Sequence, residues 1–388
     1  MKILHTSDWH VGKRLITRDR LAEQEEVLNE IVEICDREGI ELVLIAGDVF
    51  DTYTPSADAE NLFFRIVKKV AGDHRAVLMI SGNHDDGVRL SASAPLAEEY
   101  GIYIVGNSRA ALPITSQRPV RPVRSGKGYA VFENERGERA FVSTLPYPNE
   151  ARFKEAKSDL PFVDQVKQWI EEGESGNVDQ DPSVFLSHIF VLGGEISESE
   201  REIGLGGARA LPVDALPKSE YIALGHLHKK QRMGKGNCYY SGSPLQYSFD
   251  EANVEKTVKV FDLTKDGVQN LRDVPLTKGR KLIRLQADSS EDGAALLAKY
   301  PNCFVELTLR LTEPLTGAQS AVLSAHENLV SLRPEITVGP SFVTHSRKGF
   351  SDEKLFQEFY RLQYGEDPKE ELTTLFLSVL HTNEEGAD

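Results

Sequence analysis

The sequence has little cysteine, no long apolar run and a deficit of positive charge. Its 388 residues include three cysteines, which show no CxxC spacing. A disulfide framework and a cysteine-based zinc site are therefore not expected, and a reducing cytoplasm is the natural compartment. No apolar stretch approaches the roughly 18 residues of a membrane helix, and the opening MKILHTSDWH contains no signal-peptide core. These absences predict a cytoplasmic protein that does not associate with membranes.

The charge balance is strongly acidic. Lysine and arginine number 45 against 60 aspartates and glutamates, which gives a formal net charge of −15. Such a chain has no overall attraction to nucleic acid, so a polyanion would have to be held by local basic patches or by bound metal ions. The pattern GxxxxGK followed by Ser or Thr, which binds nucleotide phosphates, does not occur. Any ATP would therefore have to be bound by a partner.

Length and patterning predict more than one domain. A chain of 388 residues, 40% of them hydrophobic, is globular and too long for one ordinary core. Residues 2–80 predict strand 2–6, helix 18–37, strand 41–46, helix 56–70 and strand 76–80. Further strands are predicted at 140–145, 183–190, 221–224 and 256–263. After a boundary near 275–278, a small α+β module is predicted as strand 281–286, helix 291–299, strand 304–311, helix 317–328 and strand 329–338.

Chemically distinctive side chains follow these strands, at the positions where open α/β sheets bind ligands. They are Asp8, His10, Asp48, Asn83, His84, His188, His226 and His228. Residues i and i+2 of an extended segment point the same way, so Asp8 with His10, and His226 with His228, can each converge on one point. Two carboxylates, an amide oxygen and four of these five imidazoles, without His84, suit Mn²⁺, Fe²⁺ or Zn²⁺. Seven ligands are too many for one ion but fit two that share a carboxylate.

Five motifs in order carry a resemblance to a known family. They are DWH (8–10), GDVFD (47–51), GNHD (82–85), SHIF (187–190) and GHLH (225–228). With them the chain resembles the calcineurin-like metallophosphoesterases. Longer strings are similar to the SbcD family of bacterial nuclease subunits: HTSDWHVGK (5–13), AGDVFDT (46–52), GGEISESERE (193–202), YIALGHLHKKQ (221–231) and YSGSPLQYSFDE (240–251). The resemblance is strong over residues 1–263 and rests on architecture alone beyond them.

The resemblance implies the fold class and the domain order. We expect an α/β protein built as a two-sheet metallophosphoesterase sandwich flanked by helices, with a small α+β capping domain and a C-terminal helical hairpin. The implied boundaries are a nuclease domain at 1–275, a DNA-binding capping domain at 279–346 and a helix–loop–helix segment at 350–382 that docks an ATPase partner.

The resemblance also implies a function. The family consists of two-metal DNA phosphodiesterases, most active with Mn²⁺, that act as double-strand 3′→5′ exonucleases and as endonucleases on hairpins and single strands. Their partner is SbcC, an SMC-like ATPase, and together the two subunits process DNA ends in repair, recombination and replication. A homodimer within a heterotetramer and a nucleoid-associated, cytoplasmic location are implied as well.

Site residues are carried over from the family one by one. One ion is assigned to Asp8, His10, Asp48 and His228, and the other to Asp48, Asn83, His188 and His226. His84 matches the family's catalytic histidine, which is not a ligand and which stabilises charge or protonates the leaving 3′ oxygen. Asp85 is expected to orient an imidazole. Some archaeal relatives have a histidine at the position of Asp51, so Asp51 is given no catalytic role.

Basic residues next to the metal motifs are predicted to contact the phosphate backbone of DNA. They are Lys13, Arg14, Arg18, Lys229 and Lys230. Arg118, Arg121 and Arg124 are predicted to occupy a proline-punctuated loop. For each of these cations a solvated surface without ligand is the alternative interpretation.

Two apolar surfaces predict interfaces. In helix 56–70 the adjacent Leu62, Phe63 and Phe64 cannot all face one core, so we expect part of this surface at a two-fold interface, with core packing as the alternative. In the C-terminal hairpin Ser351 and Asp367 are predicted helix caps, with Pro368 at the first position of the second helix. Both helices are amphipathic, so one apolar stripe must pack on the preceding module or on the partner.

Two other functions stay open at the level of sequence. A small-substrate metallophosphodiesterase would use the same metal motifs, but the module after residue 278 argues against it. A DNA-end scaffold with a vestigial metal site is the second alternative, and the complete ligand set argues against that one.

Overall fold

The structure is a computed structural model that describes residues 1–106, 111–114, 117–148, 160–200, 210–336, 351–364 and 367–382. The chain divides into two compact units. The larger comprises Met1–Arg310 and Leu315–Glu335, and the smaller comprises Leu311–Pro314 and Ile336–Asp388. Within the described residues no helix combines the length and the apolar character needed to cross a membrane.

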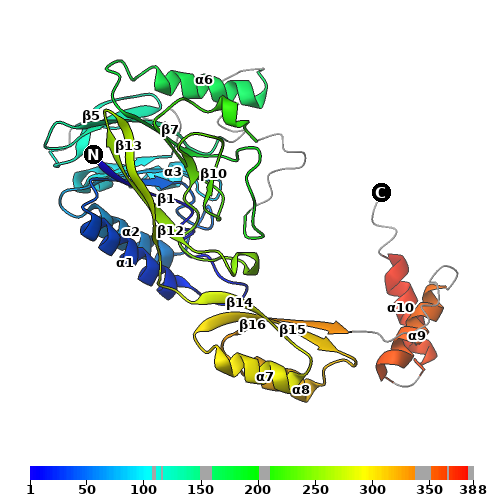
Figure 1. Ribbon diagram of the computed structural model, residues 1–388. Helices are drawn as coiled ribbons and strands as arrows, with labels where there is room; N and C mark the ends of the chain where they lie inside the picture. Colours follow the sequence, from blue (N-terminus) through cyan, green and yellow to red (C-terminus); the bar gives the residue numbers. More distant parts are fainter. Residues whose placement is uncertain are drawn as a thin grey trace. The chain divides into compact units, whose positions relative to one another are not determined.

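Two mixed sheets form the centre of the larger unit (Figure 1). The first has the strand order β13-β12-β1-β2-β3-β4. Its strands are β1 (Lys2–Thr6), β2 (Leu42–Ala46), β3 (Ala76–Ile80), β4 (Ile102–Val105), β12 (Thr257–Thr264) and β13 (Gly267–Pro275). Strands β1 to β4 are parallel, whereas β12 is antiparallel to β1. The carboxyl ends of β1, β2 and β3 therefore meet at one edge of the sheet.

The second sheet has the order β10-β11-β9-β8-β7-β6-β5. Its strands are β5 (Arg121–Gly126), β6 (Tyr129–Glu133), β7 (Arg139–Leu145), β8 (Ser183–His188), β9 (Tyr221–Gly225), β10 (Gln231–Arg232) and β11 (Cys238–Tyr240). Strands β7, β8, β9 and β11 are parallel, so the carboxyl ends of β8 and β9 are also neighbours.

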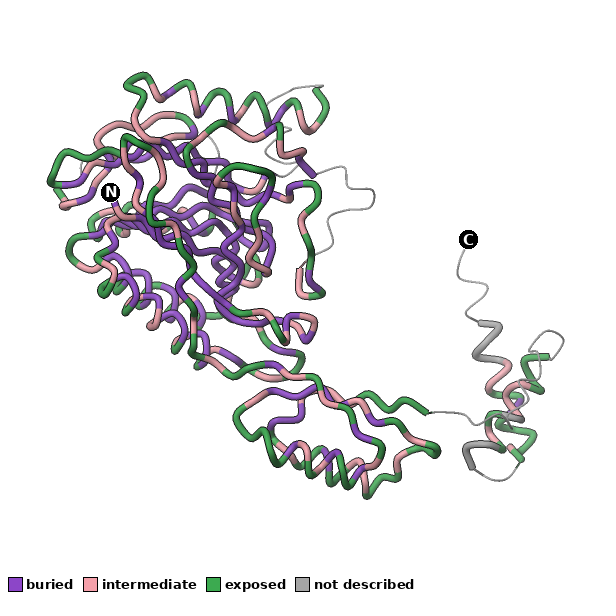
Figure 2. The backbone as a smooth tube through the Cα atoms, viewed as in Figure 1, coloured by how far each residue is buried: buried purple, intermediate pink, exposed green. Residues whose placement is uncertain are grey.

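Alternating side chains build the core on both faces of the first sheet. Leu42 and Leu44 of β2 pack with Val184 of the second sheet, whereas Val43 packs towards helices α1 (Leu21–Glu38) and α2 (Ala57–Ala71). Helix α6 (Phe162–Glu174) covers the outer face of the second sheet. Both sheets are accordingly buried between more exposed helices (Figure 2). This helix–sheet–sheet–helix sandwich confirms the predicted fold class.

Short helices and a three-stranded module complete the larger unit. The short helices are α3 (Gly87–Ser91), α4 (Ala94–Ala97), η1 (Glu98–Tyr100), η2 (Val213–Ala215) and η3 (Phe249–Glu251). The module has the strand order β14-β15-β16 and two helices. Its elements are β14 (Lys281–Ala287), α7 (Ser290–Lys299), β15 (Cys303–Leu311), α8 (Gly317–Ser324) and β16 (Leu329–Ile336).

Hydrogen bonds and a small apolar cluster join this module to the sandwich. The Glu30 carboxylate accepts the backbone N–H groups of Thr277 and Lys278 at 2.9 and 3.0 Å. Leu282 N–H donates to Gln246 Oε1 at 2.8 Å. The apolar cluster consists of Leu15, Phe249, Leu282 and Phe304. Residues 277–278, which link the sandwich to the three-stranded module, are therefore bonded to helix α1, and strand β14 is bonded to the segment before η3.

The smaller unit contains helices α9 (Asp352–Tyr364) and α10 (Glu370–Thr382). The rings of Phe356 and Phe376 stack between them, with centroids 4.1 Å apart. Ser351 Oγ accepts Lys354 N–H at 3.4 Å, as the predicted cap should. The cap predicted at Asp367 is wrong, because its carboxylate pairs with Arg361 at 2.9 Å and the helix begins at Glu370 rather than at Pro368.

Other departures from the predicted elements have local causes. Arg121 and Arg124 lie in strand β5 and not in a loop, and Arg124 pairs with Asp179 at 2.5 Å. Helix α8 ends at Ser324 instead of residue 328, because the buried Asn328 donates its amide to the Leu297 and Tyr300 carbonyls. The predicted end of the last module strand, residue 338, lies outside the described residues.

Candidate metal centre

The eight distinctive side chains come together where strands of both sheets end. Asp8 and His10 follow β1, Asp48 follows β2, Asn83 and His84 follow β3, His188 ends β8, and His226 and His228 follow β9. None is more than 9% exposed. Polar groups withdrawn this far from water are costly unless they find partners, so their convergence indicates a built site.

Two glycines allow close contacts between the strand ends that carry the site residues. A Cβ atom on Gly225 would lie 1.8 Å from the Ala46 carbonyl oxygen, and one on Gly82 would lie 2.0 Å from Asp48 Oδ1. His188 Nδ1 lies 2.8 Å from the same Ala46 oxygen, to which it donates. Packing between β2 and the second sheet thus requires glycine in the motif GHLH, and the contact between the turns after β2 and β3 requires glycine in the motif GNHD.

Four of the site residues have a left-handed backbone, which non-glycine residues rarely adopt. The φ angles are 53° at Asp8, 43° at His10, 48° at Asp48 and 110° at His226. Conformations of this kind cost about 1–3 kcal/mol each and persist where the surrounding structure imposes them. The strain lies at the turns that aim these side chains inward, as is typical of a functional site.

The first group of ligand atoms comprises Asp8, His10 and His228, all within 4.8 Å of one another. The Nε2 atoms of the two histidines face each other at 3.1 Å. His10 Nδ1 makes no hydrogen bond among the described residues but lies 3.3 Å from the Asp51 carboxylate, an acceptor that favours a proton on Nδ1 and the lone pair on Nε2. His228 Nδ1 faces Ser199 Oγ at 2.6 Å. Two buried lone pairs that face each other repel, and a cation beside them would remove the repulsion.

The second group lies around Asn83. Its Oδ1 atom is 2.8 Å from His188 Nε2 and 3.0 Å from His226 Nδ1. His226 Nε2 has no hydrogen-bond partner among the described residues. Asp48 lies between the two groups, because its Oδ2 atom is 3.4 Å from His188 Nε2 and 3.5 Å from His10 Nε2. Its other oxygen accepts the His84 N–H at 2.8 Å, which fixes the carboxylate.

The protonation of two of the histidines favours cation binding. Burial lowers the pKa of His226 to about 3 and that of His10 to about 4, so both are neutral at pH 7, the form that coordinates a metal. Burial raises the pKa of Asp8 to about 8. Burial by itself would lower the pKa of His188, but the Asp48 carboxylate has the larger effect and raises this pKa to about 9. The negative charge of Asp48 is thus strong enough to keep the buried His188 imidazole protonated, so this part of the site attracts positive charge.

The donor set fits divalent transition metals. Carboxylate, amide and imidazole donors with unsatisfied lone pairs match Mn²⁺, Fe²⁺ or Zn²⁺ better than the all-oxygen sites of Mg²⁺ and Ca²⁺. The Asp48 carboxylate stands where it could serve both groups, as the sequence predicts for a bridging ligand.

His84 is placed differently from the other histidines. Its Nδ1 atom donates to the Asp51 carbonyl oxygen at 2.6 Å, and its ring meets the His10 ring edge-on at 4.6 Å. His84 also offers a ring nitrogen within 4.8 Å of ligand atoms of His10 and Asp48. Distance alone therefore leaves open whether His84 binds a metal, and its role needs a test that separates binding from chemistry.

The Asp85 carboxylate accepts hydrogen bonds from the backbone rather than from an imidazole. It accepts the N–H groups of Val49, Phe50 and Gly82 at 3.1, 2.9 and 2.9 Å. These bonds join the turn that carries Asp48 to the turn that carries Asn83. Asp85 therefore holds two ligand-bearing turns together, which differs from the predicted contact with a ring.

The cations predicted to contact DNA are mostly engaged within the protein. Lys13 pairs with Asp51 at 2.7 Å, and Arg18 donates to the Leu329 carbonyl at 3.1 Å. Lys229 lies 3.5 Å from Asp250, and Lys230 pairs with Glu255 at 2.9 Å. Arg14 is the most open of the five, with 57% of its side chain exposed. Arg14 is accordingly the best placed of the five to reach a phosphate.

Tyr247 is a site residue that the sequence analysis missed. Its ring packs edge-on against His10 and His228, with centroids 5.5 and 5.6 Å away, and its hydroxyl donates to the Trp9 carbonyl. The string YSGSPLQYSFDE contained this residue, but nothing in its spacing indicated contact with two histidines.

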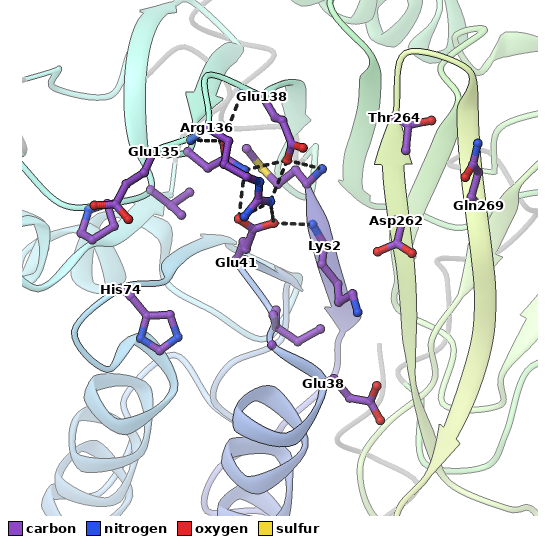
Figure 3. Close-up of a pocket in the computed structure, with 16 residues that line it drawn as sticks. Lys2, Glu38, Glu41, His74, Glu135, Arg136, Glu138, Asp262, Thr264 and Gln269 are labelled. Atoms are coloured by element: carbon purple, nitrogen blue, oxygen red, sulfur yellow. Dashed lines mark hydrogen bonds and ion pairs between the residues drawn. The ribbon is translucent and has the colours of Figure 1, made fainter.

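A separate cavity of about 660 Å³ lies at the amino ends of β1 and β2, and it is lined by none of the eight site residues (Figure 3). Arg136 bridges Glu41 and Glu138 there at 2.9 and 2.8 Å. Arg136 thus offsets part of the acidic charge of this cavity, and none of the predicted ligands lines it. The chemistry is therefore concentrated at the carboxyl ends of the strands.

Comparison with known proteins gives a consistent result. Residues 1–230 match the family described as calcineurin-like phosphoesterase. The chain is similar to the SbcD subunit of the nuclease SbcCD of Bacillus subtilis (strain 168), at 34% identity over 99% of both chains. The SbcD subunits of Rhodobacter capsulatus and Escherichia coli (strain K12) are 31% and 24% identical to it, over 85% and 98% of each chain.

Proposed function

Because this chain belongs to the calcineurin-like phosphoesterase family, and within it to the SbcD nuclease subunits, we propose that it is a Mn²⁺-dependent DNA nuclease. The proposed activities are double-strand 3′→5′ exonuclease and endonuclease on hairpins and single strands. The proposed setting is DNA end processing in repair, recombination and replication, in the cytoplasm at the nucleoid. The convergence of seven buried oxygen and nitrogen donors on two adjacent points is the observation that carries the proposal.

Seven side chains are proposed to hold two metal ions. Asp8, His10, Asp48 and His228 would bind one ion, and Asp48, Asn83, His188 and His226 the other. When bound, such ions supply Lewis acidity at the phosphate and lower the pKa of a coordinated water. The position of Asp48 between the groups supports a shared ligand, and Asp8 offers an oxygen within 4.8 Å of ligand atoms of Asp48 and His188 as well as of His10 and His228.

The protein's own contribution to the reaction is proposed to lie with His84. Because Nδ1 donates to the Asp51 carbonyl, the second ring nitrogen, Nε2, is the one proposed to act on a phosphate. A histidine in this position can stabilise the charge that develops in the transition state or protonate the leaving 3′ oxygen. The Asp51 carbonyl fixes the orientation of the ring, and the carboxylate of the same residue holds Lys13 nearby.

Contacts with DNA are proposed for the metal-site rim and for the capping module. Lys13, Arg14, Arg18, Lys229 and Lys230 are the rim candidates. In the capping module, Arg284 and Arg333 of the two outer strands both pair with the buried Glu306 of β15, at 2.7 and 2.8 Å. They keep 45% and 57% of their side chains exposed. A sheet face that fixes two guanidinium groups in this way suits a phosphate backbone.

Assembly is proposed to follow the family as well. A chain without the nucleotide-binding pattern needs SbcC for ATP-dependent action, and the segment 350–382 is the proposed docking element. Phe359 there is 60% exposed, and on helix α2 Phe64 is 42% exposed whereas Leu62 and Phe63 are buried. An exposed Phe64 supports a homodimer through α2 within a heterotetramer. The domain boundaries at 1–275, 279–346 and 350–382 remain predictions.

One assay separates this proposal from its alternatives. The purified chain with Mn²⁺ is offered linear duplex DNA, a DNA hairpin and bis-p-nitrophenyl phosphate. We expect cleavage of both DNA substrates and its loss with EDTA. Turnover of the small ester alone would favour a small-substrate phosphodiesterase, and DNA binding without any cleavage would favour a scaffold.

A further inference from the structure

His228 is attached to a buried chain of hydrogen bonds that the proposed reaction does not use. Its Nδ1 atom lies 2.6 Å from Ser199 Oγ, and Ser199 Oγ donates to Glu251 Oε1 at 2.7 Å. Lys256 Nζ donates to the second carboxylate oxygen of Glu251 at 2.5 Å and to the His228 carbonyl at 2.8 Å. Glu251 is fully buried and Lys256 is 7% exposed. The chain thus runs from a buried ion pair to the imidazole.

The direction of each hydrogen bond follows from the donors available. A serine hydroxyl has one proton, and Ser199 gives it to the Glu251 carboxylate, which can only accept. Ser199 Oγ must therefore accept from His228, so the ring proton is on Nδ1. The lone pair of His228 is then on Nε2, the atom that faces His10 Nε2 at 3.1 Å. Ser199 and Glu251 consequently select the tautomer in which Nε2 is free to bind a metal.

The segment that carries Ser199 also holds the backbone of His228. Glu200 Oε1 accepts the His228 N–H at 2.6 Å, and Glu200 Oε2 accepts the Ser197 N–H at 2.8 Å. Glu195 N–H donates to Gln231 Oε1 at 2.9 Å, just beyond the histidine pair. The segment Gly193–Glu200 therefore lies along the turn that carries His228 and contacts both its ring and its main chain.

We propose that Ser199 and Glu251 are positioning residues for His228, which fix its tautomer and its ring orientation for metal binding. The inference rests on the proposed role of His228 as a metal ligand. Partners of this kind, one bond removed from the ligand, typically change metal affinity 10–100-fold when they are removed. Only the ion held by His228 should be affected, because no atom of Ser199 or Glu251 is hydrogen-bonded to Asn83, His188 or His226 among the described residues.

The test is titration of the metal-free chain with Mn²⁺ by calorimetry. The wild type should bind two ions, and Ser199→Ala should weaken one of them 10–100-fold and leave the other unchanged. Ser199→Thr keeps the hydroxyl and should restore affinity to within about threefold of the wild type. Glu251→Gln keeps the shape but leaves one accepting oxygen, which Lys256 requires, so the new amide NH₂ would face Ser199 and the same ion should be weakened as in Ser199→Ala.

Ile196→Ala is the matched control, because Ile196 lies in the same segment with 60% of its side chain exposed, and the substitution keeps the carbonyl to which Lys229 donates. It should leave both Mn²⁺ affinities unchanged. Equal losses in Ile196→Ala and Ser199→Ala would overturn the inference, since they would show a general effect of the segment. If the wild type bound two ions and Ser199→Ala had the same Mn²⁺ affinities, the inference would also be overturned. That result would leave the nuclease proposal intact. A wild type that binds no Mn²⁺ would overturn both.

Discussion

The substitution Gly225→Ala tests whether the two sheets must touch for the site to form. The added Cβ atom would lie 1.8 Å from the Ala46 carbonyl oxygen and 2.9 Å from His188 Nδ1. Ordinary contacts are about 3.4 Å or longer, so β2 and β9 would have to separate by about 1.5 Å. The φ angle at Gly225 lies outside the left-handed region, so the effect is one of space and not of backbone conformation.

The expected cost combines two contributions. Overpacking a buried contact costs about 1–3 kcal/mol. Separation would also break the hydrogen bond from His188 Nδ1 to Ala46, which leaves buried polar groups unpaired at about 1–3 kcal/mol. We therefore expect Gly225→Ala to lower the free energy of unfolding by about 2–5 kcal/mol. Because His188 is displaced, the affinity for Mn²⁺ should fall as well.

Urea denaturation in the presence of EDTA measures the first effect, and Mn²⁺ titration measures the second. Gly236→Ala is the matched control, since a Cβ atom there meets nothing within 4 Å and no left-handed φ is required. It should change the free energy of unfolding by less than about 1 kcal/mol. If Gly225→Ala were as stable as the control and bound Mn²⁺ normally, the close packing of the two sheets at the site would be refuted.

Three further predictions concern chemistry, pH and assembly. His84→Gln should keep Mn²⁺ occupancy and DNA binding while nuclease activity falls about 10²–10⁴-fold; loss of an ion would show that His84 is a ligand. Burial lowers the pKa of His5 to about 3, below its unfolded value of 6.5. Below pH 6.5 the folded protein therefore binds fewer protons than the unfolded chain, and its free energy of unfolding decreases as the pH falls. His5→Gln should flatten this dependence by up to about 1.4 kcal/mol per pH unit between pH 6 and 4, measured as urea stability against wild type; equal slopes would contradict the assignment. Removal of residues 349–388 should leave ATP-independent nuclease activity intact and abolish co-purification with SbcC; undiminished binding would place the docking element elsewhere.

The strand ends could be predicted because strong local patterns mark them. Strands β1 and β3 match their predicted bounds, Lys2–Thr6 and Ala76–Ile80, since each is a short apolar run that ends at a polar motif. Strands β4, β5, β6 and β13 were not predicted. In β5, for example, the sequence RPVRSG alternates weakly and contains a proline, and its strand character depends on pairing with β6.

The surroundings of the ligands could not be predicted, because they come from distant parts of the chain. Ser199 and Glu251 lie 29 and 23 residues from His228, and nothing in a single sequence indicates that they meet it. The resemblance predicted that Asp85 orients an imidazole, but its carboxylate is used by three backbone N–H groups. Sequence motifs thus identify the donors, and only the fold shows what orients them.

Asp48 is proposed to join two metal sites, and Mn²⁺ titration of the wild type and of Asp48→Ala measures whether it does. The Asp48 carboxylate lies 3.5 Å from His10 Nε2 in one group and 3.4 Å from His188 Nε2 in the other. We expect two Mn²⁺ ions per wild-type chain and weakened binding of both in Asp48→Ala, with nuclease activity lost. A wild type that binds a single ion, or an Asp48→Ala chain that keeps one of two sites at full affinity, would contradict this proposal.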